Sequence, residues 1–222
     1  MRKEGIIKIN KKIKAIIFDM NGVIVDDELL HKLAFQKVFK SIGNSLSDEE
    51  FEKYFLGHTD KDGFFLAFKS KKINKDLKEY VSKKANYYKK LAQDNLKPFP
   101  GIINFINKIS KKYNLALASG SSLEEVKVIL NTFSLIDKFK VIVGAEDVAK
   151  GKPEPEIYLL AARKLKLLPN QCLVIEDTVS GVEAAKSAGM ICIAITNTVG
   201  KKELIGADKI VDNISEIKII YE

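Results

Sequence analysis

The stretch CLVIEDTVSGVEAAKSAGMICIAIT, residues 172–196, carries the clearest fold signal in the chain. It begins and ends with short apolar runs, CLVIE (172–176) and CIAIT (192–196), and the segment between them has helical spacing. Continuous apolar runs are typical of strands that are covered on both faces, and strands that alternate with helices indicate parallel pairing. The stretch therefore predicts a strand–helix–strand unit of an α/β sheet.

The same alternation extends on both sides of this unit. Four more runs are candidate strands: KAIIF (14–18), LALAS (115–119), KVIVG (140–144) and KIV (209–211). Segments with helical spacing separate them, among them GIINFINKISKKY, SLEEVKVILNTF and PEIYLLAARKLK. We therefore predict an α/β fold, a Rossmann-like parallel sheet with helices on both faces.

Residues 29–97 break this rhythm, because their pattern is helical throughout and contains no convincing strand. The segment NLKPFPG (95–101) then ends the helical region with two prolines and a glycine. We predict an inserted α-helical domain at 29–97. The α/β core is then discontinuous and consists of 1–28 and 98–222.

Composition narrows the function classes. The 222 residues are 46% hydrophobic and contain no apolar run near the roughly 20 residues that span a bilayer, so we expect a cytoplasmic protein with no membrane partner. Cys172 and Cys192 lie in apolar runs and are predicted to be core residues. The formal charge of +8 comes almost entirely from lysines interleaved with acids, which predicts a solvated surface and no nucleic-acid partner. Such a field favours small anions, and a monomer is the default expectation.

Polar residues follow the predicted strands where each one ends. Asp19 follows the first strand, Ser119 ends the second, Lys152 comes after the third, and Glu176 and Asp177 close the fourth. In a parallel sheet these ends share one edge, where ligands bind. Carboxylates there can hold Mg²⁺ or attack phosphorus, while a hydroxyl, an ammonium group and backbone N–H groups neutralise phosphoryl oxygens. The set predicts phosphoryl transfer.

Four segments carry a family resemblance: FDMNGVIVD, LALASGSS, KGKPEPEIY and LVIEDTVSGVEAAKSAGM. In this order and spacing they resemble the four motifs of the haloacid dehalogenase-like superfamily, in particular its subgroup of β-phosphoglucomutase-like phosphatases and mutases. The resemblance implies that the insertion is a helical cap. It also implies Mg²⁺-dependent chemistry on a small phosphorylated substrate through an aspartyl-phosphate.

The resemblance assigns roles to residues of the predicted core. It implies that Asp19 is the nucleophile and a metal ligand, that Asp177 is a second ligand, and that the backbone carbonyl of Asn21 contacts the metal. Ser119, the neighbouring backbone at Gly120 and Lys152 are the implied binding groups for the transferring phosphoryl group. Glu176 is implied to be an outer-shell or substrate-contacting carboxylate.

Two cap residues have implied counterparts in the mutases. His31 lies twelve residues after Asp19 and matches a histidine near the general acid and base, and Lys84 roughly aligns with a lysine that binds the substrate phosphate. The GHTD turn (57–60), where the mutases commonly carry an arginine, contains none. This difference favours a phosphatase over a mutase.

Asn21 departs from the family pattern, which has an aspartate here as general acid and base. An amide neither gives nor takes a proton, and losing such a group typically costs about 10²–10⁴ in rate. Four explanations are open. The asparagine is engineered, or it is natural and accompanied by slow turnover or by a substitute acid such as His31 or Glu28. Alternatively, it indicates dehalogenase or phosphonatase chemistry, or it indicates a catalytically silent homologue. We predict a Mg²⁺-dependent phosphatase of small metabolites such as sugar phosphates. The alternatives are a β-phosphoglucomutase-type mutase and a catalytically silent ligand-binding homologue.

Overall fold

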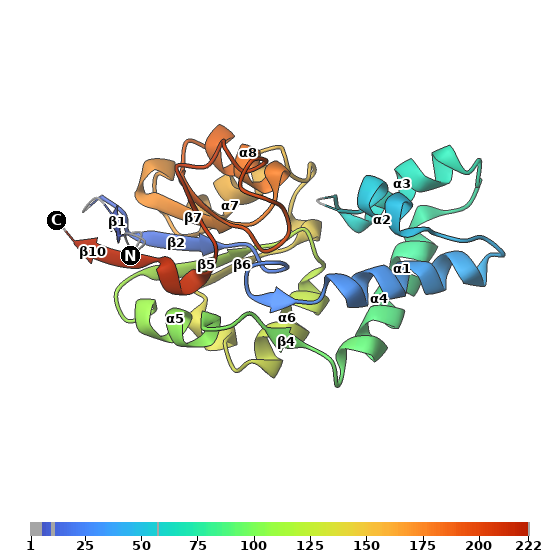
Figure 1. The fold of residues 1–222 in the computed structure, drawn as a ribbon, viewed down its shortest axis with the longest axis horizontal. Coiled ribbons are helices and arrows are strands. Elements are labelled where there is room, and N and C mark those ends of the chain that lie inside the picture. Colours follow the sequence, from blue (N-terminus) through green and yellow to red (C-terminus); the bar gives the residue numbers. More distant parts are fainter. Residues whose placement is uncertain (1–5, 10–11, 57, 222) are drawn as a thin grey trace. The chain divides into compact units, whose positions relative to one another are not determined.

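The computed structural model describes residues 6–9, 12–56 and 58–221. The chain divides into two compact units (Figure 1). The first, here called the α/β unit, comprises Met1–Val25 and Pro98–Glu222, and the second, the helical unit, comprises Asp26–Lys97. Within the described ranges, no helix is long and apolar enough to cross a membrane.

A six-stranded parallel sheet forms the centre of the α/β unit and confirms the predicted fold class. Its order is β6-β5-β2-β7-β8-β9. The strands are β2 (Ala15–Phe18), β5 (Asn114–Ala118), β6 (Val141–Val143), β7 (Cys172–Glu176), β8 (Ile191–Ile195) and β9 (Lys209–Val211). Because the first strand of this sheet, β2, lies between β5 and β7, chain order reverses at β2. A reversal of this kind opens a crevice at the carboxyl edge of the sheet.

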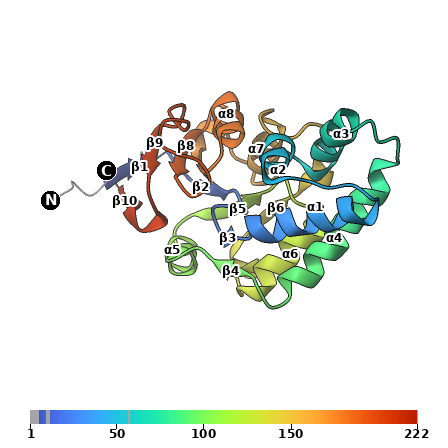
Figure 2. The same cartoon turned by 45° about the vertical axis from the view of Figure 1, so that its right-hand side comes forward.

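Helices cover both faces of this sheet (Figure 2). α7 (Glu156–Lys164) and α8 (Val179–Ser187) lie on one face, and α5 (Ile102–Ile109) and α6 (Leu123–Thr132) lie on the other. Four short 3-10 helices complete the described part of this unit: η1 (Ile136–Lys138), η2 (Ala145–Asp147), η3 (Pro169–Gln171) and η4 (Ile214–Glu216). All residues of β2 and β7 are buried. This explains why β2 is apolar throughout and why β7 is apolar up to Glu176, its last residue.

The described structure also contains strands that the sequence pattern did not predict. β1 (Ile6–Ile9) pairs in parallel with β10 (Lys218–Tyr221), and β3 (Val25–Asp26) pairs with β4 (Lys97–Pro98) where the chain passes between the units. Both cysteines are buried free thiols, as expected for core residues.

The helical unit contains α1 (Glu28–Ser41), α2 (Asp48–Tyr54), α3 (Asp60–Ser70) and α4 (Leu77–Ala92). Side-chain caps from Ser47, Thr59 and Asp76 begin the last three, where backbone N–H groups otherwise lack partners. Its core is aromatic: six phenylalanines pack with ring centroids 4.0–6.2 Å apart, namely Phe35, Phe39, Phe51, Phe55, Phe64 and Phe68. Gly57, in the GHTD turn, lies outside the described residues.

Candidate active site

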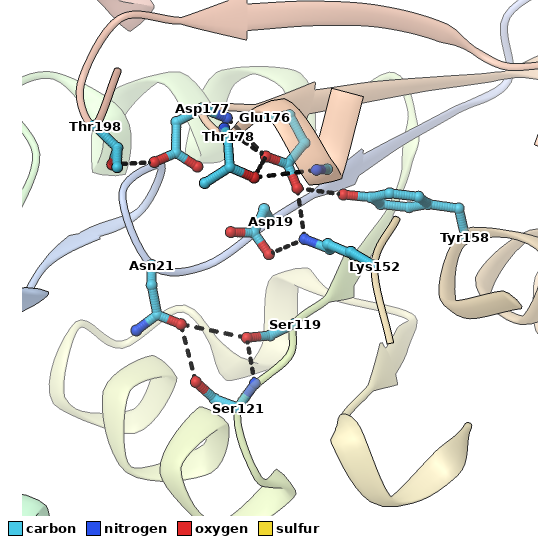
Figure 3. Close-up of polar contacts among 11 residues, drawn as sticks. Asp19, Asn21, Ser119, Ser121, Lys152, Tyr158, Glu176, Asp177, Thr178 and Thr198 are labelled. Atoms are coloured by element: carbon cyan, nitrogen blue, oxygen red, sulfur yellow. Dashed lines mark hydrogen bonds and ion pairs between the residues drawn. The ribbon is translucent and has the colours of Figure 1, made fainter. Parts of the chain in front are cut away.

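The carboxyl ends of three neighbouring strands and one loop bring the predicted core residues together (Figure 3). The backbone N–H of Asp19 donates to Ile175 on β7 at 3.0 Å, and that of Ser119 donates to Val143 on β6 at 3.0 Å. The sheet's hydrogen bonds therefore continue one residue past β2 and β5 and fix where these polar side chains begin. Glu176 ends β7, and Asp177 follows it.

Lys152 forms ion pairs with two of these carboxylates. Its Nζ lies 2.6 Å from Asp19 Oδ1 and 2.5 Å from Glu176 Oε1, and its side chain is only 11% exposed. Burial alone would lower the pKa of this ammonium group, but the two carboxylates raise it above its ordinary value. Lys152 is therefore a fixed positive charge beside Asp19.

Glu176 is fully buried and extensively hydrogen-bonded. The Tyr158 hydroxyl donates to Oε1 at 2.7 Å, and Oε2 accepts from the N–H of Asp177 at 2.8 Å and from the N–H and hydroxyl of Thr178 at 3.0 Å each. Burial raises the pKa of Glu176, but the charge and hydrogen bond of Lys152 together with these donors hold it below its ordinary value. These contacts favour an outer-shell role over direct contact with substrate.

Asp19, Glu176 and Asp177 form an acidic cluster whose ligand atoms lie within 4.8 Å of one another. Burial, opposed in part by Lys152, raises the pKa of Asp19 to about 7, and burial together with the charges of Glu176 and Asp19 raises the pKa of Asp177 well above its ordinary value. Within the described structure, Asp177 Oδ1 is buried and receives no hydrogen bond. A bound cation would neutralise the negative charge of these neighbouring carboxylates and would be coordinated by Asp177 Oδ1. These residues therefore fit a divalent metal ion.

Gly22 has φ +76°, and a Cβ built there would lie 1.8 Å from Asp177 Oδ2 and 2.8 Å from Thr198 Oγ1. Gly22→Ala is therefore expected to displace Asp177, to weaken Mg²⁺ binding by at least about tenfold as changes around metal ligands do, and to destabilise the fold. Isothermal titration with Mg²⁺ and urea unfolding measure both effects.

Gly43→Ala is the matched control for this prediction. Gly43 has φ +72°, yet no atom lies within 4 Å of a Cβ built there, so the variant isolates the backbone strain of about 1 kcal/mol. Equal Mg²⁺ affinity in the two variants would contradict the close approach of Gly22 to Asp177.

Asn21 is held by two serines. Its Oδ1 accepts from the Ser121 hydroxyl at 2.9 Å and from the Ser119 hydroxyl at 3.4 Å. Ser119 Oγ itself accepts the N–H of Ser121 at 3.1 Å, which leaves the Ser119 proton for Asn21. Gly120 lies in the same turn, between the two serines.

Sequence reasoning assigned no role to several side chains at this edge. Ser121 contacts Asn21, Tyr158 contacts Glu176, and the Thr198 hydroxyl donates to Asp177 Oδ2. Ser121 lies in the segment LALASGSS and Tyr158 in KGKPEPEIY, so the family resemblance pointed to these segments but not to the partners of these two side chains. Thr198 follows β8 and lies in none of the four segments that carry the family resemblance, so the sequence did not point to it.

His31 and Lys84 belong to the helical unit. His31 Nε2 lies 3.2 Å from Asp27 Oδ2, and its ring lies 4.3 Å from that of Tyr88. Lys84 is fully buried, with Nζ 2.9 Å from Asp60 Oδ2. These contacts lie within the helical unit, so the roles of both residues toward a substrate stay predictions.

Comparison with known proteins supplies independent information. A family model described as haloacid dehalogenase-like hydrolase matches residues 16–195. The phosphorylated carbohydrates phosphatase of Thermotoga maritima is 34% identical over 178 residues, which cover 80% of this chain and 82% of that protein. The β-phosphoglucomutase of Bacillus subtilis is 31% identical over 215 residues, covering 93% and 92%. A solved structure of mutant CbbY from Rhodobacter sphaeroides in complex with xylulose-(1,5)-bisphosphate is similar with a TM-score of 0.82 at 27% identity, covering 93% of this chain and all of that one.

Proposed function

Because the chain belongs to the haloacid dehalogenase-like hydrolase family, we propose that it is a Mg²⁺-dependent phosphatase of small phosphorylated metabolites, sugar phosphates among them. One observation carries the proposal: Lys152 Nζ bridges Asp19 and Glu176 beside a buried acidic cluster at the carboxyl edge of the sheet. Phosphorylated carbohydrates are the substrates named for the Thermotoga maritima relative. This agreement between site chemistry and relatives favours a phosphate ester as substrate.

In the proposed reaction, an oxygen of Asp19 attacks phosphorus and forms an aspartyl-phosphate, while the bond from phosphorus to the ester oxygen breaks and its electron pair leaves with that oxygen. Lys152 restrains the charge of Asp19 and, with Ser119 and the backbone at Gly120, binds the phosphoryl oxygens. Asp19, Asp177 and the backbone carbonyl of Asn21 would hold Mg²⁺, which when bound neutralises phosphoryl charge. Water then attacks phosphorus, the Asp19 carboxylate leaves, and inorganic phosphate is released.

We further propose that residues 29–97 form the cap, with His31 and Lys84 contributing to substrate binding. The aromatic core of the helical unit and the ion pair of buried Lys84 with half-buried Asp60 support a separately folded element of this kind. Closure of such an element over a bound substrate excludes water from the reaction.

A phosphosugar mutase is the second candidate, favoured by the 31% identity to β-phosphoglucomutase over 93% of the chain. A mutase passes the phosphoryl group of the aspartyl-phosphate to a second hydroxyl of a sugar phosphate, whereas a phosphatase passes it to water. Isomerised sugar phosphate without release of inorganic phosphate would favour the mutase.

A panel of phosphate monoesters, assayed with Mg²⁺ and again after chelation with EDTA, tests the proposed function. The panel contains aryl phosphates, acyl phosphates and sugar phosphates. We expect phosphate release that stops on chelation and returns when Mg²⁺ is restored. Complete inertness toward every ester, in a folded chain that binds Mg²⁺, would contradict the phosphatase and favour a silent binding homologue.

A further inference from the structure

Breaking a phosphate ester leaves an oxygen that must carry the bonding electrons away. When the new bond from Asp19 to phosphorus forms, the bond from phosphorus to the leaving oxygen breaks, and its electron pair stays on that oxygen. A nearby acid can protonate the oxygen as this happens, which typically accelerates the step by about 10²–10⁴. Without such an acid, the leaving group departs as an anion.

The hydroxyl and amide groups at this edge are not placed to act as that acid. Asn21 carries an amide, which does not ionise at neutral pH. The hydroxyl protons of Ser119 and Ser121 are directed at Asn21 Oδ1. In Figure 3 the Oδ1 of Asn21 faces both serines, and its Nδ2 lies on the far side. This residue can give a hydrogen bond to an oxygen, but it cannot give a proton.

Other polar side chains at this edge are engaged in ion pairs and hydrogen bonds or belong to the acidic cluster. Lys152 bridges two carboxylates, and the Tyr158 hydroxyl donates to Glu176. Glu176 and Asp177 belong to the acidic cluster, which needs its negative charge to hold a cation. Among the described side chains that meet at this edge in the α/β unit, we therefore find none positioned as a general acid.

We propose that this site is selective for phosphate compounds whose leaving group is stable as an anion. These are acyl phosphates, which are mixed anhydrides, aryl phosphate esters and, among sugar phosphates, those on the anomeric hydroxyl, which is more acidic than an ordinary alcohol. Carboxylic acids ionise near pH 4 and phenols near pH 10, so their anions depart without a proton, whereas ordinary alcohols are far weaker acids. The inference rests on the proposed function and narrows its substrate class. Esters of ordinary alcohols turn over slowly.

The test is a series of phosphate monoesters whose leaving groups span acyl, aryl and alkyl types, measured as kcat/KM with Mg²⁺. This constant reports the steps through the first phosphoryl transfer. We expect kcat/KM to fall steeply as the leaving group becomes less acidic, with aryl esters exceeding simple alkyl esters by at least about 10²–10⁴-fold. The series needs only the unchanged chain.

Asn21→Asp supplies the matched variant, because a carboxyl group of the same shape can donate a proton. It is expected to raise kcat/KM for alkyl esters by about 10²–10⁴-fold and to change that for aryl esters by less than about tenfold. A plot of kcat/KM against the acidity of the leaving group is then less steep for Asn21→Asp than for the unchanged chain.

Three outcomes separate this inference from the proposed function. Similar kcat/KM values for aryl and alkyl esters in the unchanged chain would overturn the inference, while the phosphatase would stand. The proton would then come from a group outside this edge, such as His31 or Glu28 of the helical unit. An equal gain for both ester types in Asn21→Asp would overturn it as well. Inertness toward acyl, aryl, alkyl and sugar phosphates alike, in a folded chain that binds Mg²⁺, would overturn the phosphatase itself.

Discussion

Replacing Asp19 with Asn is expected to lower kcat/KM by at least about 10⁴-fold on every phosphate ester, as loss of a nucleophile does in other enzymes. Asparagine has nearly the same shape, but its amide cannot attack phosphorus. Asp19 also supplies one of the two carboxylates that face Lys152, and Glu176 at 2.5 Å keeps that lysine in place in the variant. The loss should therefore fall on chemistry, with phosphate binding largely retained.

Steady-state kinetics of Asp19→Asn and of Asp137→Asn measure this effect. Asp137 is an exposed acid in η1, so its substitution controls for the change of charge and is expected to preserve kcat/KM. Activity of Asp19→Asn within about tenfold of the unchanged chain would contradict a nucleophilic Asp19.

Replacing Lys152 with Met is expected to destabilise the metal-free protein by about 3–5 kcal/mol, because it leaves two buried carboxylates without their compensating charge. The Asp19 and Glu176 side chains are only 9% and 0% exposed, so water cannot take over that role. The same change removes the group that restrains Asp19, so we also expect catalysis to be lost. Urea unfolding without metal measures the free energy of unfolding.

Lys186→Met is the matched control for this measurement. Lys186 also forms a close ion pair, 2.7 Å from Asp208 Oδ2, but its side chain is 39% exposed. Solvent-exposed pairs contribute at most about 1 kcal/mol, so the control should lose little stability. Equal losses in the two variants would contradict the account of Lys152 as the hub of a buried network.

The sheet was predictable because its signal is local. Each central strand is a continuous apolar run that ends at a polar residue, and β7 and β9 begin and end where the sequence pattern placed them. β5 ends one residue earlier than predicted, so that Ser119 lies just beyond the strand. Parallel pairing then brings the strand ends to one edge, which is why the acidic cluster could be anticipated.

The contacts that define the site's chemistry were not predictable, because they join residues far apart in the chain. The hydrogen bond from Ser121 to Asn21 spans 100 positions, and that from Tyr158 to Glu176 spans 18. Which donors face a given carboxylate depends on how α7 packs on the sheet, and no periodicity encodes that. The burial of Lys84 against Asp60 was equally hidden, since nothing in a lysine-rich sequence distinguishes one lysine from the others.

The pairing of β1 with β10 shows the same limit for the fold. These two strands of four residues each lie near opposite ends of the chain, and short apolar runs do not specify a distant partner. The sequence pattern therefore predicts the central sheet, whereas the pairing of β1 with β10 depends on three-dimensional packing.

In the proposed mechanism, Asp19 attacks phosphorus and carries the phosphoryl group. Rapid acid quenching of the Mg²⁺-loaded protein with an aryl phosphate, reduction by borohydride and peptide mass mapping test it most directly, because borohydride converts an aspartyl-phosphate to homoserine. We expect homoserine at position 19 in the unchanged chain, and none in Asp19→Asn. A phosphoryl group or homoserine at any other residue, or none in a protein that is turning over substrate, would contradict it.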